Sequence, residues 1–456
     1  MTQPVDAIAH LRHVSWEVPA PFALTLADGG GVLEFNRVLR WLPGRRVSGE
    51  ACWNGKTVFA KLFIGEAAQR HGSREQQGLE ALRTHAVPTP ALLAVVALPT
   101  VGVLVLSEFL PGARTLDGAA DDLASLRPAL ALLSCLHAAG LVHDDLHLGN
   151  FLFQDDKAFL IDGDGIHPAA ADRLLDNLAL LLSQLPVFLD GQRQVLLDAY
   201  ARPVDVELLD RQVAAWRRRR LQRFLAKTQR NCTQFAVDRN IRHFSVRLRD
   251  APAALADLLA QPDAAIDAGR RLKSGATCTV AASAVESLPV VIKRYNLKHW
   301  RHALSRVWRP SRAWHSWREA HRLAFYGIAT PPPLAVLEER WGPLRGRAFL
   351  ITGFCPGLAL IDCLQSDCVP DAELAQAIPA LFEALARLRI THGDLKASNL
   401  LWHDGALQLI DLDAMTQHRS ESAFRRAWRR DRGRLLRNWP ADSVLHQWLA
   451  RNLPPG

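Results

Sequence analysis

The sequence lacks the cysteine patterns of a disulfide framework or of a structural zinc site. Its 456 residues include seven Cys, and none of them forms a C-x-x-C pair. An odd number of scattered Cys favours reduced thiols in a cytosolic protein. The N-terminus has no basic segment followed by an apolar core, so we expect no signal peptide and a cytoplasmic location.

Lysine is also scarce, with 8 Lys against 47 Arg, while the formal net charge is +9. A basic excess predicts an acidic partner such as nucleic acid, anionic lipid or a phosphorylated substrate. The sequence contains no recognised nucleic-acid-binding module, so we expect no nucleic acid partner. Because lysine is rare, the positions of the few lysines carry information.

No uninterrupted apolar segment has the length and composition of a membrane span. Residues 90–107 lack charge, but Pro99 and Gly102 interrupt them. They predict two buried strands joined by a turn. The composition, with 49% hydrophobic and 22% charged residues, excludes wholesale disorder and allows a large core.

One pattern occurs twice in the chain. HDDLHLGN at 143–150 recurs as HGDLKASN at 392–399, an offset of 249 residues (392 − 143 = 249). Each copy precedes an acidic pair, in LIDGD at 160–164 and LIDLD at 409–413. A period of this length indicates a duplicated domain, since solenoid repeats are about 20–45 residues long.

Upstream features repeat as well. An apolar strand ends in a lysine in both halves, and an Arg-Glu pair opens a helical pattern farther along. The lysine and the glutamate are 14 residues apart in the first half (75 − 61) and 26 in the second (319 − 293), so the second half carries an insertion. We expect a first domain over 1–215, a basic connecting segment over 216–250, and a second domain over 251–456.

These residue types in this order suit phosphoryl transfer from ATP. A loop Asp can accept the proton of an acceptor hydroxyl, an Asn five residues on and a later Asp can bind Mg²⁺ through oxygen, and a strand Lys oriented by a helix Glu can hold the phosphates. The predicted residues of the first half are Lys61, Glu75, Asp145, Asn150 and Asp162, and those of the second half are Lys293, Glu319, Asp394, Asn399 and Asp411. Lys396 lies within the second loop and is also predicted to bind the cofactor.

Some roles stay open. Glu80 lies on the same expected helix as Glu75 and is an alternative to it, and one half could be a degenerate domain that only binds. Asp164 and Asp413 are either second metal ligands or structural residues.

Departures from the protein-kinase pattern restrict the class of acceptor that we expect. Neither lysine follows a G-x-G-x-x-G loop, no A-P-E follows either metal-binding Asp, and 45 residues follow Asp411 (456 − 411). We therefore expect a small-molecule or glycan acceptor rather than a protein.

With these motifs, the second half of the chain resembles the Kdo/WaaP (InaA-type) lipopolysaccharide-core kinases of Gram-negative bacteria. The residues that carry the resemblance are VVIKRY at 290–295, SWREAHRLAFYGIATPPPLAV at 316–336, HGDLKASNLL at 392–401, LIDLDAM at 409–415 and RRDRGRLLRNW at 429–439. The first half is similar to the same superfamily and also to aminoglycoside and choline kinases. Asp144, where the family has Gly or Arg, adds a negative charge beside Asp145.

The resemblance implies an α+β fold with two tandem protein-kinase-like domains, each with a small β-rich N-lobe and a shortened, mainly helical C-lobe. It implies an enzyme that uses ATP and Mg²⁺ to phosphorylate heptose or Kdo hydroxyls of the lipopolysaccharide core, at the cytoplasmic face of the inner membrane. Two alternatives remain, a kinase for a soluble small molecule and a non-catalytic tandem pseudokinase scaffold.

Two basic stretches also have two interpretations each. The Trp- and Arg-rich stretch at 296–322 predicts either a helix at an anionic membrane or glycolipid, or a helix packed on its own domain. The seven arginines of 425–437 either face a phosphate-bearing sugar or form a solvated helix face.

Overall fold

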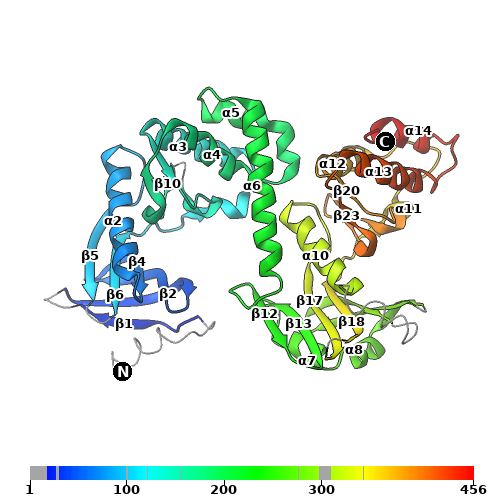
Figure 1. The fold of residues 1–456 in the computed structure, drawn as a ribbon, viewed down its shortest axis with the longest axis horizontal. Coiled ribbons are helices and arrows are strands. Elements are labelled where there is room, and N and C mark those ends of the chain that lie inside the picture. The colour runs from blue at the N-terminus through cyan, green and yellow to red at the C-terminus, as the bar shows by residue number, and fades with distance from the viewer. Residues whose placement is uncertain are drawn as a thin grey trace. The chain divides into compact units, whose positions relative to one another are not determined.

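The protein is described from a computed structural model. The described residues are 18–26, 30–98, 101–120, 122–155, 157–275, 277–296, 310–342 and 344–455. The chain divides into two compact units. Unit 1 comprises Met1–Leu185 and Leu189–Arg220, and unit 2 comprises Pro186–Phe188 and Leu221–Gly456. Each unit contains a β-sheet followed along the chain by a mainly helical part (Figure 1).

The sheet of unit 1 is antiparallel, with the strand order β1-β2-β3-β4-β6-β5. Its strands are β1 (Phe22–Thr25), β2 (Val32–Leu42), β3 (Arg46–Trp53), β4 (Lys56–Ile64), β5 (Leu92–Leu98) and β6 (Gly102–Glu108). Apolar residues alternate along β2, where Leu33 and Phe35 are buried, as expected for a strand with one face on a core. The helix α2 (Ala68–Thr84) packs on strands β4, β5 and β6.

The helical part of unit 1 carries the first loop motif on short strands. Its elements are β7 (Arg114–Thr115), η1 (Leu116–Ala119), α3 (Leu123–Ala138), β8 (Leu141–His143), η2 (Leu148–Asn150), β9 (Phe151–Gln154), β10 (Lys157–Leu160), η3 (Gly163–Gly165), β11 (Ile166–Pro168), α4 (Ala171–Leu182), η4 (Val187–Gln192), α5 (Arg193–Tyr200) and α6 (Val206–Lys227). Strand β8 pairs with β11, and β9 pairs with β10. A leucine-rich core from α3, α4 and α5 fixes these pairs, so the loop between β8 and η2 rests on rigid structure.

The sheet of unit 2 has the order β12-β13-β17-β18-β16-β15-β14. Its strands are β12 (Phe235–Arg239), β13 (His243–Leu248), β14 (Arg270–Ser274), β15 (Cys278–Val285), β16 (Leu288–Tyr295), β17 (Pro333–Trp341) and β18 (Leu344–Gly353). Helices α7 (Leu255–Ala260), α8 (Pro262–Ala268) and α10 (Arg312–Phe325) accompany it. Ser311 caps α10 by accepting a hydrogen bond from the backbone N–H of Trp314.

The helical part of unit 2 repeats the arrangement of short strands. Its elements are β19 (Leu358–Ala359), α11 (Leu360–Cys363), α12 (Ala372–Arg387), β20 (Ile390–Thr391), η5 (Ala397–Asn399), β21 (Leu400–His403), β22 (Ala406–Leu409), η6 (Leu412–Ala414), β23 (Thr416–Gln417), α13 (Glu421–Leu436) and α14 (Val444–Asn452). Phe382 and Trp428 are fully buried and pack against each other at the centre of its core.

This architecture confirms the expected α+β fold with two kinase-like units, each with a β-rich lobe and a mainly helical lobe. Strands β5 and β6 confirm the two strands expected over residues 90–107. The segment 216–250 consists of the end of α6 followed by β12 and β13. Residues 297–309, which hold most of the insertion and of the Trp- and Arg-rich stretch, lie outside the described residues.

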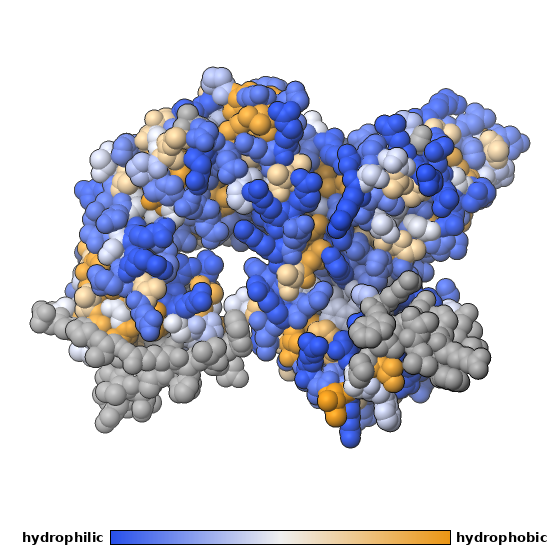
Figure 2. Space-filling model, in the orientation of Figure 1, coloured by the Kyte–Doolittle hydropathy of each residue, from blue (hydrophilic) through white to orange (hydrophobic). Residues whose placement is uncertain are grey.

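Among the described residues, none of the helices combines the length and the apolar character that a membrane crossing requires. Hydrophilic side chains predominate on the face of the molecule drawn in Figure 2, where apolar ones form small separate patches. Trp314 and Trp317, at the start of α10, are buried in the core beside the sheet of unit 2. For these two residues, the structure agrees with the packed-helix interpretation.

Candidate active sites

In unit 1, three predicted residues meet at one point. The amine of Lys61, on β4, lies 2.6 Å from Glu75 Oε1 on α2 and 3.1 Å from Asp162 Oδ1. Burial opposes the charge of Lys61, but Glu75 and Asp162 outweigh it and raise the pKa of the amine. Burial raises the pKa of Glu75, whereas Asp162 keeps a lowered pKa because Lys61 and Arg46 offset its own burial. Lys61, Glu75 and Asp162 therefore form one ion cluster, although Lys61 and Asp162 are 101 residues apart in the sequence.

The backbone explains how Asp162 reaches this cluster. Asp162 has φ +74°, in the left-handed region that L-residues rarely adopt, and its counterpart Asp411 has φ +60°. The turn that follows Asp162 packs tightly on α2, since a Cβ placed on Gly78 would lie 1.9 Å from the carbonyl oxygen of Gly163. Glycine at both positions lets helix and turn approach backbone to backbone.

The loop of unit 1 places Asp145 at the surface and buries Asn150. The backbone N–H of Asp145 donates to Nδ1 of His143, which is 1% exposed. The side-chain oxygen of Asn150 accepts the backbone N–H of His147 at 2.8 Å. A backbone N–H can donate only to an acceptor, so this bond sets the orientation of the Asn150 side-chain amide, with its oxygen facing the backbone of the loop.

The neighbouring acids serve as anchors of the loop and the turn. Asp144 Oδ1 lies 2.9 Å from Arg173 and 3.0 Å from His167, so its charge is compensated away from Asp145. Asp164 contacts His71 at 2.7 Å and Arg74 at 3.1 Å. The sequence left Asp164 as either a second metal ligand or a structural residue, and these ion pairs favour the structural role.

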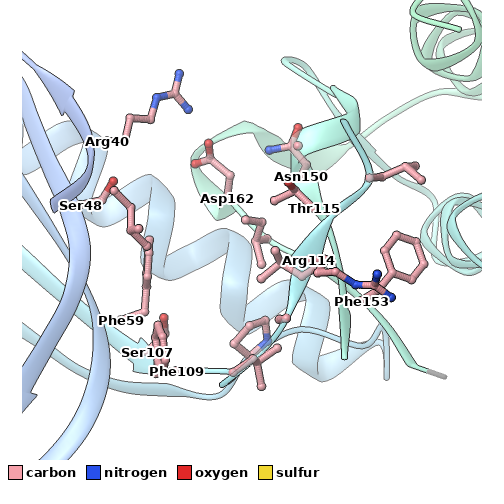
Figure 3. A pocket seen from close by; sticks show the side chains of 18 of the residues that line it. Arg40, Ser48, Phe59, Ser107, Phe109, Arg114, Thr115, Asn150, Phe153 and Asp162 are labelled. Carbon is pink, nitrogen blue, oxygen red and sulfur yellow. The ribbon is translucent and has the colours of Figure 1, made fainter. Parts of the chain in front are cut away.

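A cavity of about 940 Å³ adjoins the ion cluster of unit 1. Its apolar wall comes from residues such as Phe59, Leu79, Val105, Phe109, Leu110, Phe153 and Ile161. Its polar lining includes Lys61 and Arg46. It also includes Arg40, Asn150 and Asp162, which lie near one another in Figure 3. A cavity with an apolar wall and a group of cations suits a flat heterocycle linked to phosphates.

Unit 2 holds its lysine differently. The amine of Lys293, on β16, lies 2.6 Å from Asp411 Oδ1 and 2.9 Å from Asp413 Oδ1. Although burial opposes its charge, Tyr295 and the two carboxylates raise its pKa. Glu319, the predicted partner on α10, instead accepts hydrogen bonds from Arg322 at 2.7 and 3.1 Å. The structure thus brings Lys293 and Asp411 together but leaves Glu319 paired elsewhere.

The loop of unit 2 places Asp394 between two cations. Asp394 lies 3.1 Å from Lys396 Nζ and 3.3 Å from Arg434 Nη1, on α13. Arg434 also donates to the backbone oxygen of Gly393, whose N–H donates to the buried Asp431. Lys396 therefore lies beside the predicted base, and α13 supports the loop.

Asn399 is turned the opposite way from Asn150. Its amide nitrogen donates to the backbone oxygen of Asp394 at 2.8 Å, which leaves the amide oxygen without a hydrogen bond from any described residue. Across the described residues, no group of three or more His, Cys, Asp or Glu side chains is arranged to hold a metal ion. A magnesium site of phosphoryl transfer needs only one or two carboxylates with substrate phosphates and water, so this finding is compatible with the predicted ligands.

Sequence reasoning missed Arg40, Arg46 and Arg434. The first two lie on the β2–β3 hairpin, and Arg434 is one of the seven arginines of residues 425–437. No signal in a single sequence distinguishes these arginines from the surface arginines of a chain with 47 Arg.

Comparison with known proteins finds a kinase family among the matches of this chain. Residues 269–452 match the model of the lipopolysaccharide kinase (Kdo/WaaP) family. This match covers the segments that carry the resemblance of the second half to this family, so that resemblance is confirmed. No curated protein matches the chain. A solved structure described as "WaaP in complex with acyl carrier protein" is similar at 20% identity over 41% of this chain and 88% of that one, with a TM-score of 0.33.

Proposed function

We propose that the protein is an ATP-dependent kinase that phosphorylates heptose- or Kdo-type hydroxyls of the lipopolysaccharide inner core, at one or both of its kinase-like units. The observation that carries the proposal is the arrangement of Lys293, Asp411 and Asp394 within the segment that matches the lipopolysaccharide kinase family. The glycolipid acceptor follows from the family alone.

The predicted residues of unit 2 have distinct roles in this reaction. Lys293 would bind the phosphates, and its raised pKa keeps it charged at neutral pH. Asp394, half-buried and flanked by Lys396 and Arg434, would orient the acceptor hydroxyl and accept its proton. Arg434 would hold the loop that carries Asp394, since it contacts both the carboxylate and the adjacent backbone.

The oxygen donors of unit 2 fit Mg²⁺. Asn399 offers an amide oxygen. Burial alone would raise the pKa of Asp411, but the positive charge of Lys293 lowers it, so the carboxylate is ionised. When bound, the ion neutralises charge on the transferring phosphate. An anionic glycolipid acceptor and the membrane surface where it occurs both suit the exposed arginines of α13.

The test is a phosphotransfer assay with Mg²⁺ and ATP on core glycolipid that lacks phosphate, with mass spectrometry to locate any added group. Asp394→Asn and Asp145→Asn are compared as matched single variants, because they occupy the same position in the two loops. We expect Asp394→Asn to abolish the product, since removal of a positioned base costs about 10²–10⁴-fold. No product from folded wild-type protein would contradict the proposal.

A panel of soluble aminoglycosides, choline and free sugars is run in parallel. Turnover of a soluble compound without activity on glycolipid would favour the small-molecule kinase. If ATP is not consumed with any acceptor, the non-catalytic scaffold becomes the better explanation.

A further inference from the structure

The polar lining of the unit 1 cavity includes several groups that bind anions. Arg40 on β2 and Arg46 on β3 come from one hairpin, and both line the cavity together with Ser48 of β3. Figure 3 shows Arg40 and Ser48 on these strands. The hairpin closes through residues 43–45, where Gly44 has φ +64°. It occupies the part of the sheet where a protein kinase has its glycine-rich loop, whose backbone covers the phosphates.

The two arginines leave donors available to a ligand. The Nε of Arg46 is buried and has no hydrogen-bond partner among the described residues, and its Nη1 lies 3.8 Å from Asp162 Oδ1. The guanidinium of Arg40 makes no hydrogen bond with the side chain of a described residue. Arg40 is exposed, yet partial desolvation of its guanidinium and the nearby charge of Arg46 lower its pKa against the effect of Asp162 and Asp145. An anion placed between the two arginines would relieve their repulsion.

Asn150 presents a donor rather than an acceptor to this cavity. Its oxygen is bound by the N–H of His147, and its nitrogen lies on the side of Asp162 in Figure 3. A metal ion needs an oxygen lone pair, whereas a phosphate oxygen accepts an amide N–H. In unit 2 the corresponding Asn399 has the reverse orientation, with its nitrogen bound by Asp394.

Asp162 is engaged as well. Its Oδ1 lies 3.1 Å from Lys61 and 3.8 Å from Arg46. Asp411 of unit 2 is paired with Lys293 in the same way, at 2.6 Å, so the two units differ in the amide. Asn150 offers unit 1 an N–H for a phosphate oxygen, whereas Asn399 offers unit 2 an oxygen for a metal ion.

We propose that unit 1 binds a nucleoside di- or triphosphate without requiring a divalent cation, and that Arg40, Arg46 and Lys61 hold its phosphates. This inference rests on the proposed function, from which the nucleotide is taken as the ligand. It assigns unit 1, which lies outside the segment that matches the family model, a nucleotide-binding role that is independent of metal.

The experiment measures ADP binding to the full chain by calorimetry, with either Mg²⁺ or EDTA in the buffer. Lys293→Met is included throughout to remove binding by unit 2. We expect ADP to bind this variant with a Kd that changes less than about threefold between the two buffers. Adding Arg40→Ala and Arg46→Ala should weaken binding by about tenfold or more, the usual effect of losing hydrogen bonds to a charged group.

Arg45→Ala is the matched control, because Arg45 lies in the same hairpin, is exposed and does not line the cavity. It should leave the Kd unchanged. Arg40→Ala alone is also measured, since Arg40 is exposed and its loss should leave folding intact, as a thermal melt verifies.

Binding by the Lys293→Met protein only in the presence of Mg²⁺, or no binding in either buffer, would overturn the proposal. Binding in EDTA that survives the loss of both arginines would overturn their role. Each of these outcomes is distinct from failure of the proposed function, which is judged by transfer to glycolipid and its dependence on Asp394.

Discussion

Asp413 lies 2.9 Å from the amine of Lys293, in the position that a helix glutamate fills in unit 1. Asp413 also accepts hydrogen bonds from Tyr295 at 2.6 Å and from Ser316 at 2.8 Å. These contacts hold its carboxylate between Tyr295 of β16 and Ser316 of α10. In unit 2, the residue that orients the lysine comes from the turn after Asp411, and the α10 glutamate pairs with Arg322.

Asp413→Asn should therefore impair phosphotransfer more than Glu319→Gln. Loss of the carboxylate removes a charge-assisted bond to Lys293, so we expect kcat/KM for ATP to fall about tenfold or more. Glu319→Gln should change kcat/KM by less than about threefold, because Glu319 does not contact the lysine. Steady-state kinetics with varied ATP gives both values.

Thermal melts of both variants serve as the control for folding. If Glu319→Gln has the larger effect on kcat/KM, Glu319 must reach Lys293 during the reaction, and the assignment of Asp413 as the positioning residue is wrong.

The contact between α2 and the turn after Asp162 predicts a strong effect of one methyl group. Gly78→Ala would place a Cβ 1.9 Å from the backbone oxygen of Gly163, so the helix must move away from the turn. Although Ala favours a helix over Gly by about 1 kcal/mol, the clash should destabilise unit 1 by about 1–3 kcal/mol. Denaturant unfolding measures the change.

Gly118→Ala is the control for this prediction, since a Cβ at Gly118 would have no atom within 4 Å. It should leave the stability of unit 1 within about 0.5 kcal/mol of wild type. A Gly78→Ala protein as stable as wild type would show that the helix and the turn can separate at no cost.

The sequence predicted the fold class and the grouping of Lys61 with Asp162, because an ordered motif set repeated at a fixed offset restricts the alternatives strongly. The same reasoning paired Lys293 with Glu319, but the spacing of residues in the sequence did not identify Asp413 as the second carboxylate that contacts Lys293. The acid that contacts Lys293 depends on the rotation of α10 about its own axis. The burial of Trp317 sets that rotation, and Trp317 packs against strands that are far away in the sequence. The orientations of Asn150 and Asn399 differ through single backbone hydrogen bonds, and no residue pattern encodes these.

Arg434 gives a prediction about the loop of unit 2. It contacts the Asp394 carboxylate at 3.3 Å and the Gly393 backbone, so Arg434→Ala should loosen the loop and lower kcat about tenfold. Arg451→Ala is the control, because Arg451 is an exposed arginine of α14 that donates to Gln447 and contacts neither Asp394 nor Gly393. Equal kcat values for the two variants would contradict a positioning role for Arg434.

The buried His321 of α10 makes the stability of unit 2 dependent on pH. His321 is 5% exposed, its ring packs on Trp317 at 4.2 Å and Phe235 at 5.2 Å, and its Nε2 has no hydrogen-bond partner among the described residues. Burial lowers its pKa from 6.5 to about 3. Between these values the unfolded chain binds a proton at this site and the folded chain does not, so stability is complete above pH 6.5 and falls as the pH drops toward 3.

We therefore expect His321 to cost unit 2 about 2 kcal/mol between pH 7 and pH 5, at about 1.4 kcal/mol per pH unit below 6.5. His321→Phe keeps an aromatic ring among Trp317 and Phe235 but cannot titrate. Denaturant unfolding, followed by tryptophan fluorescence at the two pH values, gives the loss of stability for each protein. Other groups titrate equally in both, so the variant should lose about 2 kcal/mol less than wild type. Equal losses would mean that His321 is protonated in the folded protein, in which case its ring must reach water or an acceptor when the pH falls.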